Sequence, residues 1–352
     1  MMPASTIIIP THNRPQFLKR LLLFLSRVQC PSSIVVVDSS DSSNASLSAV
    51  VVDDVQSQLP INYIHNRQRF EVKCMETLQA TLTPYVVLCA DDDFINPFAI
   101  EPCISFLEDN PDYAIARGVQ FIQTTDRERR IKPARFRDLD VSDPARRFSY
   151  FSDNWYSTFY CVHRTPELLS DFQITCEHTN SEHSIILPEL LLTYLSVIRG
   201  CTRYLPHFYG MRQSHANAAS CIAPKITDTT NYDAHYRRFT QCVARELSAA
   251  STLSQDESNR LVERCHGRNR ATWESGAGKK QSGMAGVIRE IARPLRKAVS
   301  IFRHGSMRHN WRTHPNLKGL ENDDIYRLMA QLIDTFPGGC DIDPDWKNGE
   351  AA

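Results

Sequence analysis

Short apolar runs alternate with longer amphipathic segments over the first quarter of the chain. Each run is rich in β-branched residues, is bounded by turn residues and has the length of a strand rather than of a helix. Uninterrupted apolar character of this kind is typical of parallel strands that are covered on both faces. The four runs are residues 6–9, 34–37, 61–64 and 85–88.

Helical signals lie between these predicted strands. Leucine and phenylalanine side chains repeat at helical spacing after the first run, and Pro15 suits a first helical turn. We expect Thr11 and Asn13 to offer caps for this helix. Residues 71–80 predict another helix before the fourth run. Because strand and helix alternate, we predict an α/β fold with a mostly parallel sheet and right-handed crossovers.

The second half of the chain has a different pattern. An apolar helix is predicted over residues 188–198, where Pro188 can open the first turn and Gly200 ends the helix. From about residue 228 the pattern is helical and polar, and a Gly/Ser/Lys-rich stretch near 274–286 is typical of a linker. We therefore predict one domain over residues 1–220 and a mainly helical C-terminal region over residues 221–352.

Polar residues directly follow three of the four predicted strands. In open α/β sheets, ligands bind beyond the carboxyl ends of the strands. A solvated loop explains any one of these polar stretches, but three of them at one edge of a sheet predict a binding site. The residues concerned are Thr11, His12, Asn13 and Arg14 after the first strand, Asp38 and Asp41 after the second, and Asp91, Asp92 and Asp93 after the fourth.

The three adjacent acids Asp91, Asp92 and Asp93, which we call the acidic turn, raise one another's pKa unless positive charge is close. A divalent cation is the simplest source of that charge. Oxygen ligands favour Mg²⁺ or Mn²⁺, which also take ligands from a substrate phosphate. The sequence therefore predicts a metal site here, with a solvent-exposed acidic turn as the alternative.

Composition narrows the class of protein. The chain has 352 residues, of which 42% are hydrophobic and 23% are charged, as in an ordinary folded globular protein. Its 40 basic and 40 acidic side chains give a net charge of zero, so we expect no nucleic-acid partner. The 11 cysteines show no paired spacing, and neither a signal peptide nor a membrane-spanning stretch is evident. These features predict a cytoplasmic protein with free thiols.

Motifs of other enzyme classes fail in this sequence. At the stretch ESGAGKKQS, the preceding Trp273 stands where a phosphate-binding P-loop needs Gly, and Lys280 stands where it needs Ser or Thr. No GxGxxG follows the first predicted strand, and no GxSxG occurs. A P-loop nucleotide hydrolase, a Rossmann dehydrogenase and an α/β-hydrolase are therefore not expected.

Three stretches together resemble a known family. In order and spacing, IIIPTHNRPQFLKRLL, VVVDSSDSS and YVVLCADDDFINP are similar to the opening of a family 2 glycosyltransferase with the GT-A fold. The resemblance extends over roughly residues 5–215. It implies a Rossmann-like, mostly parallel sheet flanked by helices, with the C-terminal helices as an extension. It also implies a nucleoside-diphosphate sugar as the donor.

The resemblance implies which residues bind the donor and which hold the metal ion. Asp38 would face the base, and Lys73 would offset the charge of the diphosphate. Asp92, Asp93 and His215 would hold Mn²⁺ or Mg²⁺, which would bridge the diphosphate. The other residues expected beside the nucleotide sugar are Pro10, Thr11, Asn13, Arg14, Asp91, Asp92 and Arg212.

Two positions depart from the pattern of the family. Ala90 stands in place of its first aspartate, and Leu190 stands in place of the second acid of a pair that opens a helix. Glu189 keeps the place of the first acid. The resemblance implies that Glu189 is the general base that deprotonates the acceptor hydroxyl, with Glu182 or Glu177 as alternatives. The other interpretation is that Glu189 only caps its helix.

The sequence thus predicts a metal-dependent, inverting glycosyltransferase. The resemblance implies a glycan or lipid-linked acceptor, as in the synthesis of surface polysaccharide or glycoconjugates. A basic segment at residues 289–312 could rest on the inner face of an anionic membrane, with a plain solvated helix as the alternative. The competing function is a non-catalytic protein that binds sugar nucleotides or glycans on the same scaffold.

Overall fold

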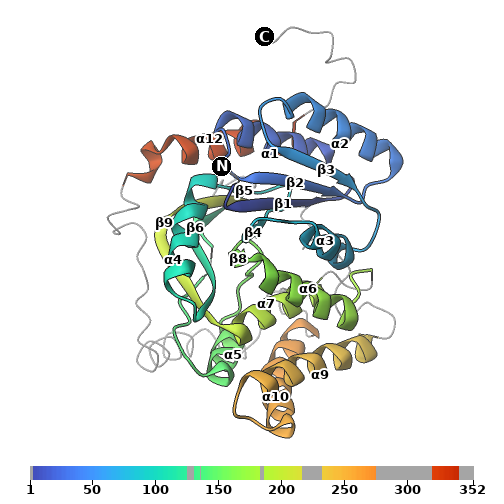
Figure 1. Ribbon diagram of the computed structural model, residues 1–352, viewed down its shortest axis with the longest axis vertical. Helices are drawn as coiled ribbons and strands as arrows, with labels where there is room; N and C mark the ends of the chain where they lie inside the picture. The colour runs from blue at the N-terminus through green and yellow to red at the C-terminus, as the bar shows by residue number, and fades with distance from the viewer. Residues whose placement is uncertain are drawn as a thin grey trace, which may run out of the picture.

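The strands that the structure describes form one mixed sheet of nine strands (Figure 1). The computed structural model describes residues 3–124, 131–134, 136–182, 186–215, 232–274 and 319–340. Along the sheet the strand order is β3-β2-β1-β4-β8-β6-β9-β5, and β7 pairs with β6. Helices flank the sheet, and the four strands at one end are all parallel. The predicted α/β fold is therefore confirmed.

The four predicted apolar runs form the parallel half of this sheet. Strand β1 is hydrogen-bonded between β2 and β4, and β3 pairs with the outer side of β2. All four strand predictions are confirmed, with β1, β2 and β3 slightly longer than the apolar runs. The strands span Ser5–Thr11 (β1), Ser33–Asp38 (β2), Ile61–His65 (β3) and Tyr85–Leu88 (β4).

Helices cover both faces of the parallel half, because successive side chains of a strand point to opposite sides. Ile7 and Ile9 of β1 belong to one core cluster with apolar side chains of α1 and α2, whereas Ile8 belongs to another with Cys74 and Leu78 of α3. Figure 1 shows α1 and α2 above the sheet and α3 below it. These helices span Pro15–Arg27 (α1), Ser42–Val55 (α2) and Phe70–Gln79 (α3).

Helix α1 begins differently from the prediction. Pro15 lies in the first turn as expected, but the N-cap residue is Arg14, whose side chain makes no capping hydrogen bond. Thr11 is the last residue of β1, and Asn13 has a φ of 54°, a left-handed conformation that asparagine tolerates. The two predicted caps are therefore wrong, and both residues lie in the connection from strand to helix.

The apolar pattern of the sequence does not predict the other half of the sheet, which is mixed. Strand β8 is antiparallel to both β4 and β6, β9 is parallel to β6, and β5 is antiparallel to β9. Because β5 directly follows the acidic turn, its pairing brings β9 beside that turn. The strands span Phe94–Ile95 (β5), Tyr113–Thr124 (β6), Ile131–Pro133 (β7), Val162–Arg164 (β8) and Cys201–Ser214 (β9).

Helix α7 corresponds to the apolar helix that the sequence predicts in the second half of the chain. It spans Ile186–Arg199, so the helix predicted over residues 188–198 is confirmed. The chain then turns into β9 at Gly200, where a Cβ atom would lie 2.7 Å from the backbone nitrogen of Ala114 in β6. The other helices of this half span Pro97–Ala99 (η1), Ile100–Asp109 (α4), Pro144–Asp153 (α5) and Thr165–His178 (α6).

The C-terminal helices pack against the rest of the fold in two places. Helices α9 and α10 share a core cluster with α5 and α7. Helix α12 instead buries Met329, Leu332 and Ile333 beside α1 and β9 (Figure 1). The predicted boundary at residue 220, residues 275–286 of the predicted linker and the basic segment 289–312 lie outside the described residues. The helices span Tyr232–Ala250 (α9), Gln255–Glu274 (α10), Leu320–Asn322 (η4) and Asp324–Thr335 (α12).

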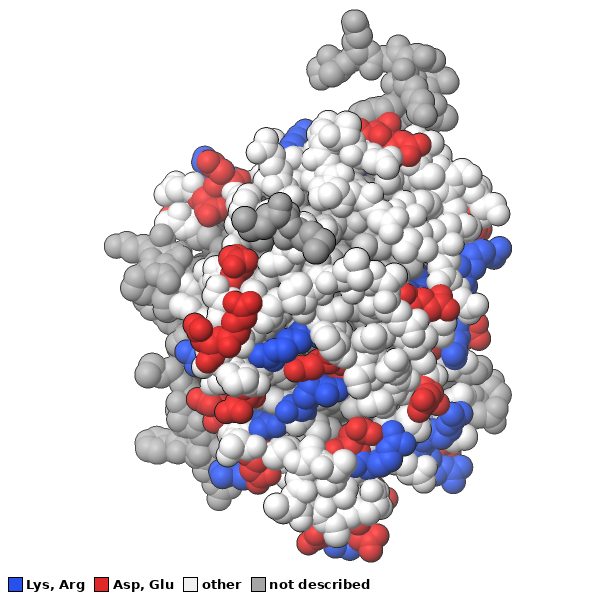
Figure 2. Space-filling model, in the orientation of Figure 1, with Lys and Arg blue, Asp and Glu red and all other residues white. Residues whose placement is uncertain are grey.

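Charged side chains of both signs are interspersed on the face that Figure 2 shows, over its lower half, where α6, α9 and α10 lie. This mixture agrees with the net charge of zero. No described helix is both long and apolar enough to cross a membrane. No disulfide joins the cysteines in the described part of the chain.

Gly210 in β9 faces the backbone of β5. A Cβ atom here would lie 2.3 Å from the carbonyl oxygen of Phe94, a backbone atom that cannot rotate away. Gly210→Ala is therefore expected to push apart two strands next to the acidic turn, and to lower the free energy of unfolding by about 1–3 kcal/mol. Urea unfolding followed by circular dichroism measures the change.

Gly267 in α10 offers a matched control, because a Cβ atom there would meet nothing within 4 Å. Gly267→Ala should raise the free energy of unfolding by up to about 1 kcal/mol, since alanine favours a helix. Equal losses of stability in the two variants would contradict the steric argument.

Candidate active site

The acidic turn lies between β4 and β5, at the carboxyl end of the parallel strands. Its residues are almost fully buried, with exposed fractions of 0% for Asp91, 6% for Asp92 and 3% for Asp93. A buried carboxylate without a partner is costly, so each one needs a cation or hydrogen-bond donors. The alternative of a solvent-exposed turn is therefore wrong.

Arg14 reaches the turn from the start of α1 and pairs with two of its carboxylates. Its Nη2 atom lies 2.5 Å from Asp91 Oδ1, and its Nη1 atom lies 2.9 Å from Asp92 Oδ2. Thr11 donates from Oγ1 to Asp91 Oδ2 over 2.6 Å. His215 follows β9, and its Nε2 atom lies 3.0 Å from Asp92 Oδ2. Residues from β1, α1 and the end of β9 thus meet at the turn.

Asp93 is held by a separate set of donors. The backbone N–H of Gln213 donates to Oδ1 over 2.8 Å, and Arg212 Nε lies 3.2 Å from Oδ2. The hydroxyl of Tyr160 also donates to Oδ2, and the guanidinium of Arg212 lies over the Tyr160 ring, 4.7 Å from its centroid. Sequence reasoning missed Tyr160 and Gln213, because one tyrosine among several aromatic residues and a backbone N–H give no distinctive signal.

Burial and charge act differently on the three carboxyl groups. Burial raises the pKa of Asp91 to about 7 despite the opposing charge of Arg14. Burial also raises the pKa of Asp93, and the charge of Asp92 adds to the effect. Burial alone would raise the pKa of Asp92, but the hydrogen bond with His215 and the charge of Arg14 outweigh it and lower that pKa. Asp92 is therefore the most readily ionised member of the turn.

Glu189 is linked to this cluster through its electrostatic effect on Arg212. Glu189 lies half-buried in the first turn of α7 and accepts a 2.6 Å hydrogen bond from Ser157 Oγ. The pKa of Arg212 is raised mainly by Tyr160, while burial acts to lower it. The charges of Asp93 and Glu189 raise this pKa further. Arg212 thus contacts the acidic turn at Asp93, and its guanidinium also feels the charge of Glu189. The start of a helix also favours the charged form of a carboxylate.

The two alternative bases lie elsewhere. Glu182 is exposed, and its backbone N–H donates to Asn180 Oδ1 over 2.9 Å. Glu177 lies in the last turn of α6 with 72% of its side chain exposed. Among the described residues, neither acid makes a hydrogen bond or ion pair to the acidic turn. Leu190, in the place of the family's second acid, is buried in the core cluster that α7 shares with α5 and α9.

The carboxyl ends of β1 and β2 form the other part of the expected donor site. Asp38 is fully buried, and its two oxygens accept from the backbone N–H of Ser40 over 2.7 Å and from the Tyr63 hydroxyl over 2.9 Å. Asn13 Oδ1 accepts from the backbone N–H of Asp41 over 2.9 Å. The predicted nucleotide-sugar residues at this edge of the sheet are Pro10, Thr11, Asn13, Arg14, Asp38, Asp91 and Asp92.

Lys73 has different partners from those expected. Its buried ammonium group donates to the carbonyl oxygens of Thr11 and Val37, over 2.8 and 3.2 Å, and to Ser39 Oγ over 2.9 Å. An ammonium group has three protons, and these three acceptors use all of them. Lys73 therefore ties α3 to the ends of β1 and β2, and it has no proton left to offer a diphosphate.

The residues around Asp92 fit a divalent cation in part. Asp92 Oδ2 and His215 Nε2 are close enough to share an ion, and Mg²⁺ is usually held by one or two carboxylates together with substrate phosphates. Asp93 fits less well, because both of its oxygens already accept hydrogen bonds. Within the described ranges, no three His, Cys, Asp or Glu side chains are grouped as a metal site. A metal at this turn would therefore need further ligands from the donor.

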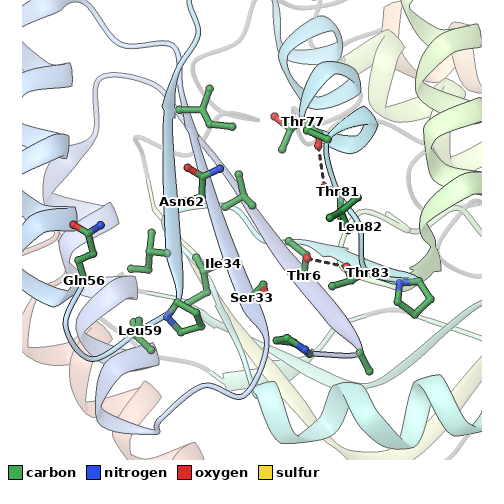
Figure 3. Close-up of a pocket in the computed structure, with 18 residues that line it drawn as sticks. Thr6, Ser33, Ile34, Gln56, Leu59, Asn62, Thr77, Thr81, Leu82 and Thr83 are labelled. Atoms are coloured by element: carbon green, nitrogen blue, oxygen red, sulfur yellow. Dashed lines mark hydrogen bonds between the residues drawn. The ribbon is translucent and has the colours of Figure 1, made fainter. Parts of the chain in front are cut away.

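A pocket of about 730 Å³ lies at the opposite end of the parallel strands (Figure 3). Its walls come from the amino ends of β1 and β2, from β3 and from the residues that follow α3, including Thr6, Ser33, Asn62 and Thr83. Its lining contains no charged side chain in the described part of the chain. The pocket is therefore unsuited to a diphosphate and is separate from the acidic turn.

Comparisons with known proteins agree with this geometry. A family model described as glycosyl transferase family 2 matches residues 6–168. No curated protein sequence matches the chain.

Among solved structures, S. aureus TarS 1–349 is similar at 14% sequence identity, with 81% of this chain and 76% of that chain covered and a TM-score of 0.53. Its complex with UDP-GlcNAc gives a TM-score of 0.56, also at 14% identity, with 81% and 77% covered. At this identity the likeness to TarS concerns the fold alone. Residues 6–168 thus match the model of glycosyl transferase family 2, and the chain shares its fold with the TarS structures. The two findings together indicate a glycosyltransferase of the GT-A fold.

Proposed function

We propose that this glycosyltransferase moves a sugar, with inversion, from a nucleoside-diphosphate sugar to a hydroxyl group of a glycan or lipid-linked acceptor. One observation carries the proposal: the partly exposed guanidinium of Arg212 lies 3.2 Å from Asp93 Oδ2 of the acidic turn, and the half-buried carboxylate of Glu189 helps to raise the pKa of Arg212. An inverting transfer needs a base for the acceptor and positive charge for the leaving diphosphate. Glu189 and Arg212 would supply these two groups.

Glu189 is the base in this proposal. One of its oxygens accepts the hydrogen bond from Ser157, which fixes the direction of the carboxylate. The second oxygen would take the proton of the acceptor hydroxyl. As this proton leaves, the acceptor oxygen attacks the anomeric carbon, and the bond from that carbon to the diphosphate breaks on the opposite side.

Arg14 and Arg212 are the cations that would receive the diphosphate. Their side chains are 21% and 36% exposed, whereas those of Asp92 and Asp93, with which they pair, are 8% and 4% exposed. A guanidinium has five N–H donors in a planar fork, so donors beyond those used by the carboxylates can bind phosphate oxygens. Both arginines would thereby stabilise the charge that develops on the leaving diphosphate.

A divalent cation, Mn²⁺ or Mg²⁺, is the proposed cofactor. Asp92 and His215 would hold it, Asp93 would be a further ligand after losing one of its present donors, and phosphate oxygens of the donor would complete the set. When bound, the cation would act as a Lewis acid and neutralise part of the charge of the diphosphate.

A uridine nucleotide is the donor to test first. The structures of S. aureus TarS include complexes with UDP and with UDP-GlcNAc. Asp38, at the end of β2, is the residue that we propose to lie against the base. A glycan or lipid-linked acceptor would give the enzyme a role in the synthesis of surface polysaccharide or glycoconjugates.

Mn²⁺ and UDP together are expected to raise the melting temperature more than either alone. A ligand that binds only the folded state at about 100 times its dissociation constant adds about 2.7 kcal/mol of stability. Asp92→Asn should abolish the part of the shift that depends on Mn²⁺, because an amide is a poor ligand for a hard cation. Differential scanning fluorimetry across a panel of nucleoside diphosphates measures these shifts.

Asp109→Asn provides the matched control, because Asp109 is exposed at the end of α4 and the substitution changes the net charge equally. This variant should keep the full shift with Mn²⁺ and UDP. A full shift in Asp92→Asn as well would exclude Asp92 as a metal ligand.

Glu189→Gln is expected to lower kcat by about 10²- to 10⁴-fold, because an amide cannot accept the proton of the attacking hydroxyl. The melting shift with Mn²⁺ and UDP should stay as in the wild type, since donor binding does not require the base. Release of UDP from UDP-sugars, with water or a glycan as the acceptor, measures kcat.

Glu182→Gln is the control for this experiment, because Glu182 is an exposed acid of the same size. It should keep wild-type turnover. A loss of turnover in Glu182→Gln, with wild-type turnover in Glu189→Gln, would transfer the role of base to Glu182.

A further inference from the structure

Arg20 of α1 is a fully buried arginine to which neither the resemblance to the family nor the proposed chemistry gives a role. Its Nη2 atom donates to the backbone oxygen of Asp92 over 2.8 Å. Its Nη1 atom donates to Gln213 Oε1 over 2.7 Å and to the backbone oxygen of Phe336 over 2.8 Å. The guanidinium also lies 5.1 Å from the ring centroid of Phe17. Arg20 thus connects the acidic turn, β9 and the chain that follows α12.

Gln213 makes a second connection among the same three parts of the structure. Its backbone N–H holds Asp93 Oδ1 over 2.8 Å, while its side-chain oxygen accepts from Arg20. Its side-chain nitrogen donates to the backbone oxygen of Pro337 over 2.8 Å. One glutamine therefore joins a carboxylate of the acidic turn to the chain after α12.

Residues 336–340, which we call the C-terminal segment, follow α12 and lie against the start of α1. The backbone N–H of Cys340 donates to the oxygen of Gln16 over 3.0 Å, and Cys340 is only 4% exposed. Gly339 has a φ of 90°, and a Cβ atom there would lie 2.6 Å from the carbonyl carbon of Gln16 and 2.7 Å from the nitrogen of Phe17. Only glycine allows this close approach.

We propose that Arg20 and Gln213 are positioning residues for the acidic turn, and that docking of the C-terminal segment is required to hold them in place. The inference rests on the proposed function of the turn, which is to bind Mn²⁺ with the diphosphate of the donor. Three like charges in one turn repel one another. Arg20 fixes the Asp92 carbonyl, and Gln213 fixes the Asp93 carboxylate. Without Phe336 and Pro337, each of these two buried side chains loses an acceptor.

The decisive comparison is Gly339→Ala with Gly338→Ala. Alanine at 339 meets backbone atoms of α1, whereas a Cβ atom at 338 would meet nothing within 4 Å. Docking is measured in the folded protein by the rate at which iodoacetamide labels Cys340, followed by peptide mass spectrometry. Binding is measured as the dissociation constant of UDP with Mn²⁺, and the UDP-sugar reaction gives KM and kcat.

We expect Gly339→Ala to label Cys340 at least 10-fold faster and to weaken binding of UDP with Mn²⁺ at least 10-fold, with KM raised more than kcat is lowered. Gly338→Ala should match the wild type in every measurement. Because coupling is reciprocal, Mn²⁺ with UDP should also slow the labelling of Cys340 in the wild type. Fast labelling with unchanged binding of UDP would overturn the proposal.

Arg20→Lys is a second variant that leaves the C-terminal segment unchanged in sequence. Lysine keeps the charge but cannot span the three acceptors of the guanidinium fork, so binding of UDP with Mn²⁺ should again weaken at least 10-fold. Wild-type binding in a folded Arg20→Lys protein, verified by its melting temperature, would overturn the proposal whatever Gly339→Ala does.

The same measurements distinguish a failure of the proposed function from a failure of the coupling between the C-terminal segment and the acidic turn. If the wild type turns over no sugar nucleotide but Gly339→Ala still weakens binding of UDP with Mn²⁺, the proposed function fails and the coupling stands. If the wild type turns over a donor and both variants keep its KM, the coupling fails and the proposed function stands.

Discussion

Three buried carboxylates in a row set the electrostatic constraint on which the rest of this structure depends. Repulsion among them and the cost of burial both require positive charge and hydrogen-bond donors around one turn. Arg14 arrives from α1, Arg212 and His215 arrive from β9 and its end, and Tyr160 arrives from the segment before β8. The mixed half of the sheet meets much of this requirement, since β9 and the segment before β8 reach the turn from distant parts of the chain.

Local patterns were sufficient to predict the parallel half of the fold. The apolar runs that became β1 to β4 needed no information beyond their own residues, and the same holds for helix α7. The polar residues at the strand ends also pointed to groups that meet in the structure, such as Thr11 and Arg14 beside Asp91. Parallel strands bring their carboxyl ends to one edge, so order along the chain is enough to predict proximity there.

The remaining contacts depend on pairing between distant segments and on backbone atoms, which have no residue signature. Strand β8 is too short to be recognised by periodicity, although it joins the two halves of the sheet. Lys73 fits the resemblance to the family, yet its acceptors are largely carbonyl groups that any residue could provide. Asp93 receives a backbone N–H from Gln213, and Arg20 donates to two backbone oxygens. None of these bonds is visible in a sequence.

The hydrogen bond between Arg20 and Phe336 has a consequence for the newly made protein, because it joins positions 316 residues apart. During synthesis the chain leaves the ribosome from its N-terminus, so Arg20 emerges long before its acceptor. Contacts between such distant residues also slow folding. The newly made chain would therefore pass through a stage in which its parallel strands are complete while the acidic turn still lacks one support.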